Sequence, residues 1–415
     1  MNIVIRRAML CGTVAVVALV SMPGATQQSA APIARYTMDA GTMSGMAAMA
    51  AGGNPLALLR GGGSGAAHQL ELRLGSSRAA TGTPAADHFM PPAAGLGQSV
   101  PLVTPVAQGQ PTQAIPGPPQ ERQMPSGKLY LFWGCGEHAG PGQPVVVDFS
   151  KMARGQIPPG LFASGVSVPG EWTVTQANSR TFGEWPNAKS TRTLSGSSSL
   201  IGDHRIAGNY SPDITFHLDH DFMAPLQPRS SKMASGAYGV TWNGLADATG
   251  YYAWAIGAKD MGRGQPNEMV WWTSSATKQF GGMLGDWLSP AAVAKLIAAK
   301  TVMPASQTSC TIPAEVTQLG GENMMVQLYG YGPESNFAYP PRPASAKTPW
   351  HPEWIARVRF RSNAMVLLSM PDMGGFSNGG SEDSDASNQG QPPSSGKPKC
   401  HGLKGIAQRA AGLCE

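Results

Sequence analysis

Charged residues are scarce in this sequence. Only 13% of its 415 residues are Asp, Glu, Lys or Arg, about half of the roughly 25% found in typical globular proteins. The net charge of +5 is too small for a protein that binds nucleic acid by neutralising phosphates. The low content of Glu, Lys and Arg also argues against a coiled coil or a protein of long helices.

Cysteine is scarce as well, with five in the whole chain. Cys11 lies in the N-terminal apolar run, which leaves Cys135, Cys310, Cys400 and Cys414 for the mature protein. Their wide spacing excludes a small disulfide scaffold, and four cysteines in an exported protein allow three pairings. We expect a Cys400–Cys414 bridge, because the segment between these two is short, and Cys135–Cys310 as the complementary bridge.

Familiar catalytic motifs are also missing. The sequence has no G-x-S-x-G elbow, no H-E-x-x-H, no phosphate-binding G-x-x-x-x-G-K and no dinucleotide-binding fingerprint. Acidic residues are few. Glu171 and Glu184, each next to a Trp, are the pair that could serve a secreted glycan-directed hydrolase, which needs two carboxylates. This hydrolase is an alternative to a protein without enzymatic activity.

The N-terminus predicts export. Arg6 and Arg7 precede an uncharged apolar run, residues 9–22, which suits the central region of a signal peptide and is too short to cross a bilayer as a helix. We expect a signal peptide over 1–25 and a mature protein in the periplasm, on the outer surface or secreted. No later apolar run is long enough to span a membrane, so the mature chain is expected to have no transmembrane segment.

Composition divides the rest of the chain. All ten Trp lie between Trp133 and Trp354, and this window is expected to hold the globular part. Before it, 26–127 is rich in Met, Ala, Gly and Pro, and its alternating stretch at 68–74 predicts one half-buried strand. After it, 371–415 is rich in Gly, Ser, Asn and Pro and is expected to be a disordered tail.

The pattern of residues within the globular window predicts β-structure. Between 128 and 370, strand-like patterns recur roughly every 8–15 residues, with Gly and Pro between them, which is typical of β-sandwiches. One helix is predicted over 290–299, because Ser289 is a good N-cap and Pro290 occupies the favoured first position. We therefore predict an all-β protein with two β-sandwich-like domains in tandem, 128–225 and 226–370, flanked by low-complexity segments.

One segment resembles a known family. In GVTWNGLADATGYYAWAIGA, a strand with Trp242 is followed by a short turn and by Tyr251 and Tyr252 at the start of the next strand. This is similar to strands B and C of a fibronectin type III-like domain, closely here and loosely over 226–370. The resemblance implies a scaffold or binding module and no particular chemistry. The whole chain also resembles a group of uncharacterised exported proteins of Gram-negative bacteria, which implies no activity.

Aromatic side chains are the leading candidates for a binding site. Exposed rings around a shallow groove can hold a sugar or a peptide chain. The rings that we single out are Trp172, Trp185, Trp271 and Trp272. The last two are neighbours on one predicted strand, so one faces the core and the other faces outward. A polysaccharide or an envelope protein is the kind of partner that such rings favour.

Three weaker patterns point to a metal. His217, Asp219 and Asp221 share one face of a predicted strand and could ligate a divalent cation or hold a sugar hydroxyl, although any solvated strand face alternates in this way. Cys135 and His138, three residues apart, could form half of a metal site or a nucleophile with its base, although a disulfide is favoured. A cluster of thioethers could bind Cu(I) or simply pack as apolar residues: Met38, Met43, Met46 and Met49.

A basic stripe, Arg357, Arg359 and Arg361, alternates with apolar residues near the end of the globular window. We expect these arginines on an edge strand, where charge discourages pairing with another sheet and where an anionic surface or polysaccharide could bind.

Together these observations favour an exported, non-enzymatic envelope protein that acts as a binding or structural module. The alternatives are the glycan-directed hydrolase and a periplasmic copper- or zinc-binding protein. No cofactor and no nucleic-acid partner is predicted.

Overall fold

The computed structural model describes 31–50, 66–105, 127–152, 156, 172–259, 268–279, 282–345 and 347–369. The predicted signal peptide, the predicted tail with Cys400 and Cys414, and Glu171 lie outside these residues. In the part that is described, no helix is long and apolar enough to cross a membrane.

Most of the regular structure belongs to one ten-stranded sheet, whose strands run in the order β6-β5-β13-β12-β16-β17-β1-β2-β7 with β14 paired to β12. The strands are β1 (Ala34–Gly45), β2 (Ala67–Ser76), β5 (Lys128–Trp133), β6 (Val145–Asp148), β7 (Thr181–Trp185), β12 (Gly250–Gly257), β13 (Glu268–Thr273), β14 (Met303–Pro304), β16 (Met325–Tyr339) and β17 (Trp354–Leu367). The β1–β17 and β5–β13 pairs are parallel, and the other neighbours are antiparallel.

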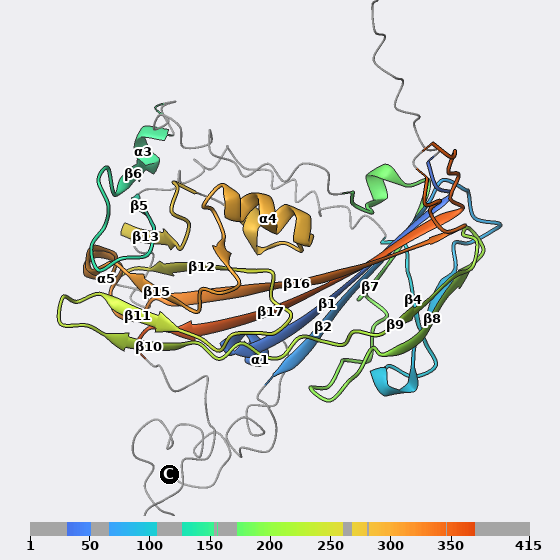
Figure 1. Ribbon diagram of the computed structural model, residues 1–415, viewed down its shortest axis with the longest axis horizontal. Helices are drawn as coiled ribbons and strands as arrows, with labels where there is room; N and C mark the ends of the chain where they lie inside the picture. The colour runs from blue at the N-terminus through green and yellow to red at the C-terminus, as the bar shows by residue number, and fades with distance from the viewer. Residues whose placement is uncertain are drawn as a thin grey trace, which may run out of the picture. The chain divides into compact units, whose positions relative to one another are not determined.

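Two smaller sheets complete the β-structure. One has the order β10-β11-β15 and the other β4-β3-β8-β9. Their strands are β3 (Ala86–Phe89), β4 (Ser99–Pro101), β8 (Gly202–Gly208), β9 (Ile214–Leu218), β10 (Arg229–Lys232), β11 (Tyr238–Thr241) and β15 (Ser309–Ile312). Figure 1 shows both small sheets on the same side of the large sheet, with α4 on the other side.

Helices are short. They are α1 (Met46–Ala50), α3 (Phe149–Met152), α4 (Pro290–Ala298) and α5 (Ala314–Gly320), with 3-10 turns at η1 (Pro92–Ala94), η2 (Gln176–Asn178) and η3 (Gly282–Gly285). The predicted helix is confirmed as α4: Pro290 opens it, and the Ser289 side chain accepts a hydrogen bond from the Ala292 N–H at 3.1 Å. The all-β, sandwich-like fold class is confirmed as well.

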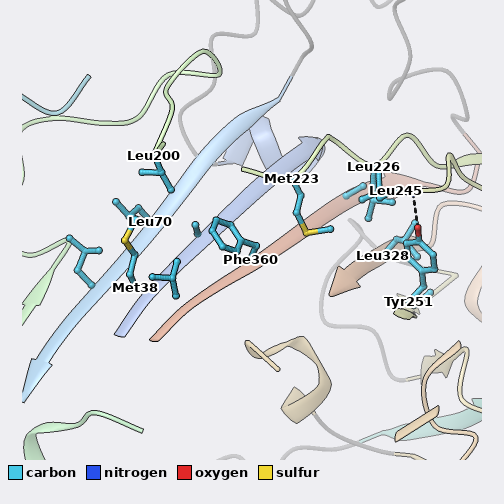
Figure 2. Packing of buried hydrophobic residues seen from close by; sticks show 14 of the residues in the cluster. Met38, Leu70, Leu200, Met223, Leu226, Leu245, Tyr251, Leu328 and Phe360 are labelled. Atoms are coloured by element: carbon cyan, nitrogen blue, oxygen red, sulfur yellow. Dashed lines mark hydrogen bonds between the residues drawn. The ribbon is translucent and has the colours of Figure 1, made fainter. Parts of the chain in front are cut away.

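The main core fills the space between the large sheet and the two small ones. Alternation along β1 sends Tyr36, Met38 and Ala40 into this core. Figure 2 shows Met38 beside Leu70 of β2, with Phe360 of β17 close by. Burying large apolar side chains of this kind stabilises the fold by roughly 1.5–3 kcal/mol each, so this face of the large sheet dominates the hydrophobic stabilisation.

The N-terminal segment contributes more strands than predicted. The expected strand at 68–74 is found within β2, but β1, β3 and β4 also come from 26–127. The sequence of β1, ARYTMDAGTMSG, is rich in Ala and Gly, which have low β-propensity. It forms a strand because it pairs on both sides, with β17 and β2.

The same sheet crosses the boundary that the sequence analysis places at 225/226. Its strands β5, β6 and β7 precede this position, whereas β12, β13, β16 and β17 follow it. All the described residues belong to one compact unit, Met1–Phe376. Trp242, the residue that carries the fibronectin-like resemblance, is buried and contacts Tyr251 edge-on, with ring centroids 5.5 Å apart.

Candidate functional site

The basic stripe does not lie on an edge strand. β17 runs between β16 and β1 in the middle of the large sheet, and Arg357, Arg359 and Arg361 are only 2%, 6% and 8% exposed. The expectation of a solvated stripe that meets an anionic surface is therefore wrong. Alternation reveals which residues share a face, but it does not reveal whether other segments cover that face.

Arg359 makes a two-pronged ion pair with Asp39 of β1. Its Nε lies 2.7 Å from Asp39 Oδ1, and its Nη2 lies 3.0 Å from Oδ2. Its Nη1 donates to the Trp287 carbonyl at 2.6 Å. Arg73 of β2 approaches Asp39 Oδ2 at 3.4 Å. Burial raises the pKa of the fully buried Asp39 carboxyl, and the two arginines oppose that rise.

Aromatic rings cover the other two arginines. The Arg357 guanidinium lies over the Trp172 ring, 4.5 Å from its centroid, and donates to the Trp172 carbonyl at 2.6 Å. Arg361 lies 4.0 Å from the centroid of the Trp287 ring and donates to the Gly285 carbonyl. Contacts of this kind offset part of the cost of burying a cation. The arginines thus hold covering segments onto the sheet.

The four candidate tryptophans fall into two groups. Trp185 and Trp272 are 6% and 1% exposed, and the Trp272 indole N–H donates to the Gly134 carbonyl at 2.9 Å. These two rings belong to the core and offer no platform to a ligand. Trp172 is half-buried over Arg357. Trp271, also half-buried, stacks on Trp254 with centroids 4.7 Å apart and planes 6° apart.

The metal candidates do not converge. His217 Nδ1 lies 2.7 Å from Asp203 Oδ1, and its Nε2 lies 3.5 Å from Asp219 Oδ1. Asp221 instead accepts the backbone N–H groups of Leu200 and Phe222, at 2.9 and 2.8 Å. Among the residues that the structure describes, no group of three or more His, Cys, Asp or Glu could hold a metal ion.

The other sulfur-containing candidates are used structurally. Met38 is fully buried, and Met43, five residues along β1, lies on the opposite face. Met46 and Met49 belong to α1. The predicted Cys135–Cys310 disulfide is confirmed and links residues 175 apart in the sequence. His138 lies beside Glu315, with Nδ1 3.1 Å from Oε1. Glu184 lies on β7, and its backbone N–H and C=O are both hydrogen-bonded to Val103.

A shallow pocket lies on the β4-β3-β8-β9 sheet and was not anticipated from the sequence. Its volume is about 480 Å³, and its lining combines apolar with polar side chains: Phe89, Met90, Asp203, His204, Arg205, Thr215 and Phe216. The Arg205 guanidinium lies 5.3 Å from the centroid of the Phe89 ring and pairs with Asp213, its Nη2 2.7 Å from Oδ2. Asp203, the partner of His217, belongs to the same lining.

A buried hydrogen-bonded chain connects this sheet to the large one. Tyr36 Oη of β1 lies 2.6 Å from His88 Nδ1 of β3, and His88 Nε2 lies 3.0 Å from His204 Nδ1 of β8. His204 Nε2 lies 2.7 Å from the Leu200 carbonyl oxygen. All three side chains are at most 2% exposed. No sequence motif marks this set, because its members come from three separate strands.

Family models, curated proteins and solved structures were all compared with the chain, and none of them matches it. The function is therefore inferred from the geometry of its own residues.

Proposed function

We propose that this chain is an exported, non-enzymatic binding module of the Gram-negative envelope, and that it holds a glycan chain at the pocket on β3, β8 and β9. The observation that carries the proposal is the lining of this pocket, which sets the Phe89 ring beside the charged groups of Arg205 and Asp203.

Proteins bind sugar rings with a combination of aromatic and charged side chains, which this pocket offers. The C–H faces of sugars stack on aromatic rings, and their hydroxyls accept from guanidinium groups and donate to carboxylates. Phe89 supplies the apolar surface, and Arg205, Asp203 and Thr215 supply the polar contacts. His217, a predicted partner for a sugar hydroxyl, lies beside Asp203. A shallow pocket also suits a polymer that extends beyond it on either side.

The environment of the pocket's carboxylate favours binding over catalysis. A catalytic acid or base is usually tuned by burial and by its neighbours. The Asp203 side chain is 93% exposed, so water surrounds it. Two deeply buried ionisable side chains are committed to other protein groups: Asp39 to Arg359, and His204 to His88 and the Leu200 carbonyl. They hold strands and covering segments together.

The test is a panel of polysaccharides, insoluble chitin and cellulose and bead-coupled pectin, together with bead-coupled extended peptides, assayed for pull-down and for turnover with the purified protein. We expect retention on a polysaccharide without turnover. Phe89→Ala and Arg205→Ala should each abolish retention while the circular dichroism spectrum remains that of the wild type. Tyr339→Ala is the matched control, because Tyr339 is 54% exposed and lies outside the pocket.

Two results would contradict the proposal. Turnover that disappears in Glu171→Gln or Glu184→Gln would favour the hydrolase. Retention that survives both pocket variants, or that favours the peptides, would remove the glycan site from this sheet. Export is tested separately, by sequencing the N-terminus of protein recovered from the periplasm of a bacterial host.

A further inference from the structure

The direction of every hydrogen bond in the Tyr36–His88–His204 chain is determined by the Leu200 carbonyl at one end of it. The Leu200 carbonyl can only accept, so His204 Nε2 carries a proton. In the neutral ring, His204 Nδ1 is then an acceptor, and His88 Nε2 must donate to it. His88 Nδ1 is therefore an acceptor as well, and the Tyr36 hydroxyl donates to it. With both imidazoles neutral, every donor in the chain meets an acceptor.

Protonation of both imidazoles breaks this pairing of donors with acceptors. One added proton on His88 Nδ1 can still be accepted by the Tyr36 oxygen. A second proton, on His204 Nδ1, would face the His88 Nε2–H across 3.0 Å, so two donors and two positive charges would meet with no acceptor between them. Phe216 stacks on His204 with ring planes 10° apart and centroids 5.2 Å apart. The phenyl ring of Phe216 provides no compensating acceptor.

Few charged groups reach the chain from the surrounding elements. Asp39, on the same strand as Tyr36, raises the pKa of the Tyr36 hydroxyl in addition to the effect of burial. Asp203 of β8 and His217 of β9 act on His204 in opposite directions. Burial is the main cause that lowers the pKa of both His88 and His204, so the neutral, fully hydrogen-bonded arrangement is the native one at neutral pH.

We propose that the Tyr36–His88–His204 chain is a pH-sensitive contact that fastens β3 and β8 to β1 of the large sheet when its imidazoles are neutral and loosens in acid. The contact is placed to act as a switch, because its hydrogen bonds join side chains of two sheets within the shared core. His204 and Phe216 also line the pocket, so weaker ligand binding in acid would follow. That last consequence rests on the proposed function, whereas the switch itself does not.

Amide hydrogen exchange of the full protein at pH 7.5 and pH 5.0, corrected for the intrinsic rates, tests the switch without any ligand. Each imidazole that stays neutral when folded but titrates near pH 6.5 when exposed should raise the opening equilibrium constant by about 30-fold at pH 5.0. We expect the amides of β3 and β8 to lose protection by one such factor for each of the two rings, about 900-fold for both together. His88→Gln and His204→Gln should each remove one such factor, and His351→Gln, a change at an exposed histidine, should keep both.

A second measurement covers the case in which a glutamine variant does not fold. Imidazole nitrogen shifts of the wild-type protein report tautomer and charge directly. We expect His88 and His204 to be neutral with the proton on Nε2 at pH 7.5, and to become protonated only as β3 and β8 lose protection. The proposal is overturned if protection of β3 and β8 is the same at both pH values, if the glutamine variants keep the full response, or if either ring titrates at pH 6.5 or above without loss of protection.

Discussion

Arg359 and Asp39 are 320 residues apart in the sequence, yet they are register partners in the parallel β1–β17 pair and form a two-pronged ion pair there. Both side chains are buried. Removing charges from water costs several kcal/mol per ion, and the cost is recovered only when the geometry is good and the remaining donors are satisfied. The Trp287 carbonyl satisfies one of those donors, so this pair also anchors the segment that carries Trp287.

Asp39→Ala should destabilise the protein by about 3–5 kcal/mol, because it leaves the Arg359 guanidinium buried without its carboxylate. Urea unfolding followed by tryptophan fluorescence measures the change. The matched control is Asp213→Ala, which breaks an Arg–Asp pair whose side chains are 51% and 54% exposed. Exposed pairs contribute only about 0–1 kcal/mol. Equal effects of the two substitutions would show that the Asp39 pair is not buried in solution.

Stability should fall between pH 6.5 and pH 5. Burial lowers the pKa of His88 and His204 in the folded protein, so below about pH 6.5 the unfolded chain binds more protons than the folded one. Their contribution is complete above the unfolded pKa and is lost as the pH falls toward the folded pKa. The slope should approach 1.4 kcal/mol per pH unit for each ring. Urea midpoints that stay constant over this range would contradict the prediction.

Sequence reasoning succeeded where the signal is local. Ser289 followed by Pro290 marks a helix start within two residues, and the alternating stretch at 68–74 marks the partly buried strand β2. The prediction failed for Arg357, Arg359 and Arg361 because their environment depends on residues far away in the chain. Trp172 and Trp287 cover them, and β1 turns their strand from an edge into the centre of a sheet. Periodicity contains none of this long-range information.

Removal of the Cys135–Cys310 bridge should cost about 2–5 kcal/mol, with the upper end favoured because the bridge closes a loop of 175 residues. The double variant Cys135→Ser/Cys310→Ser should melt at a lower temperature than the wild type without reductant, and reductant should not lower it further. A wild-type protein whose melting temperature does not respond to reductant would argue that the bridge contributes nothing to stability.

Trp272→Ala should cost about 3–5 kcal/mol, the usual penalty for removing a large ring from a core, because Trp272 is 1% exposed and its N–H has a partner. Trp271→Ala should cost clearly less. Its ring is half-buried, and the stacking on Trp254 contributes about 0.5–1.5 kcal/mol beyond the buried area. Equal losses would mean that Trp271 is as deeply packed as its neighbour.

The candidate binding site could be predicted only in fragments. His217 and its alternating acids stand out in the sequence, but the partner that they find, Asp203, comes from the neighbouring strand. Phe89 lies over a hundred residues earlier and reaches the pocket only because β3 pairs with β8. Single residues on a strand face have no distinctive spacing, so a pocket that is assembled across three strands leaves no motif.

The central claim, that a glycan binds on the β4-β3-β8-β9 sheet, is tested most directly by mapping backbone-amide chemical shifts while soluble oligosaccharides are added. The probes are chitohexaose, cellohexaose and hexagalacturonate. We predict that one of them produces saturable shifts that cluster on the strand residues around Phe89, Asp203, Arg205 and Thr215, and that Phe89→Ala removes these shifts. Shifts that cluster around Trp254 and Trp271 instead, or no shifts with any probe at millimolar concentration, would contradict it.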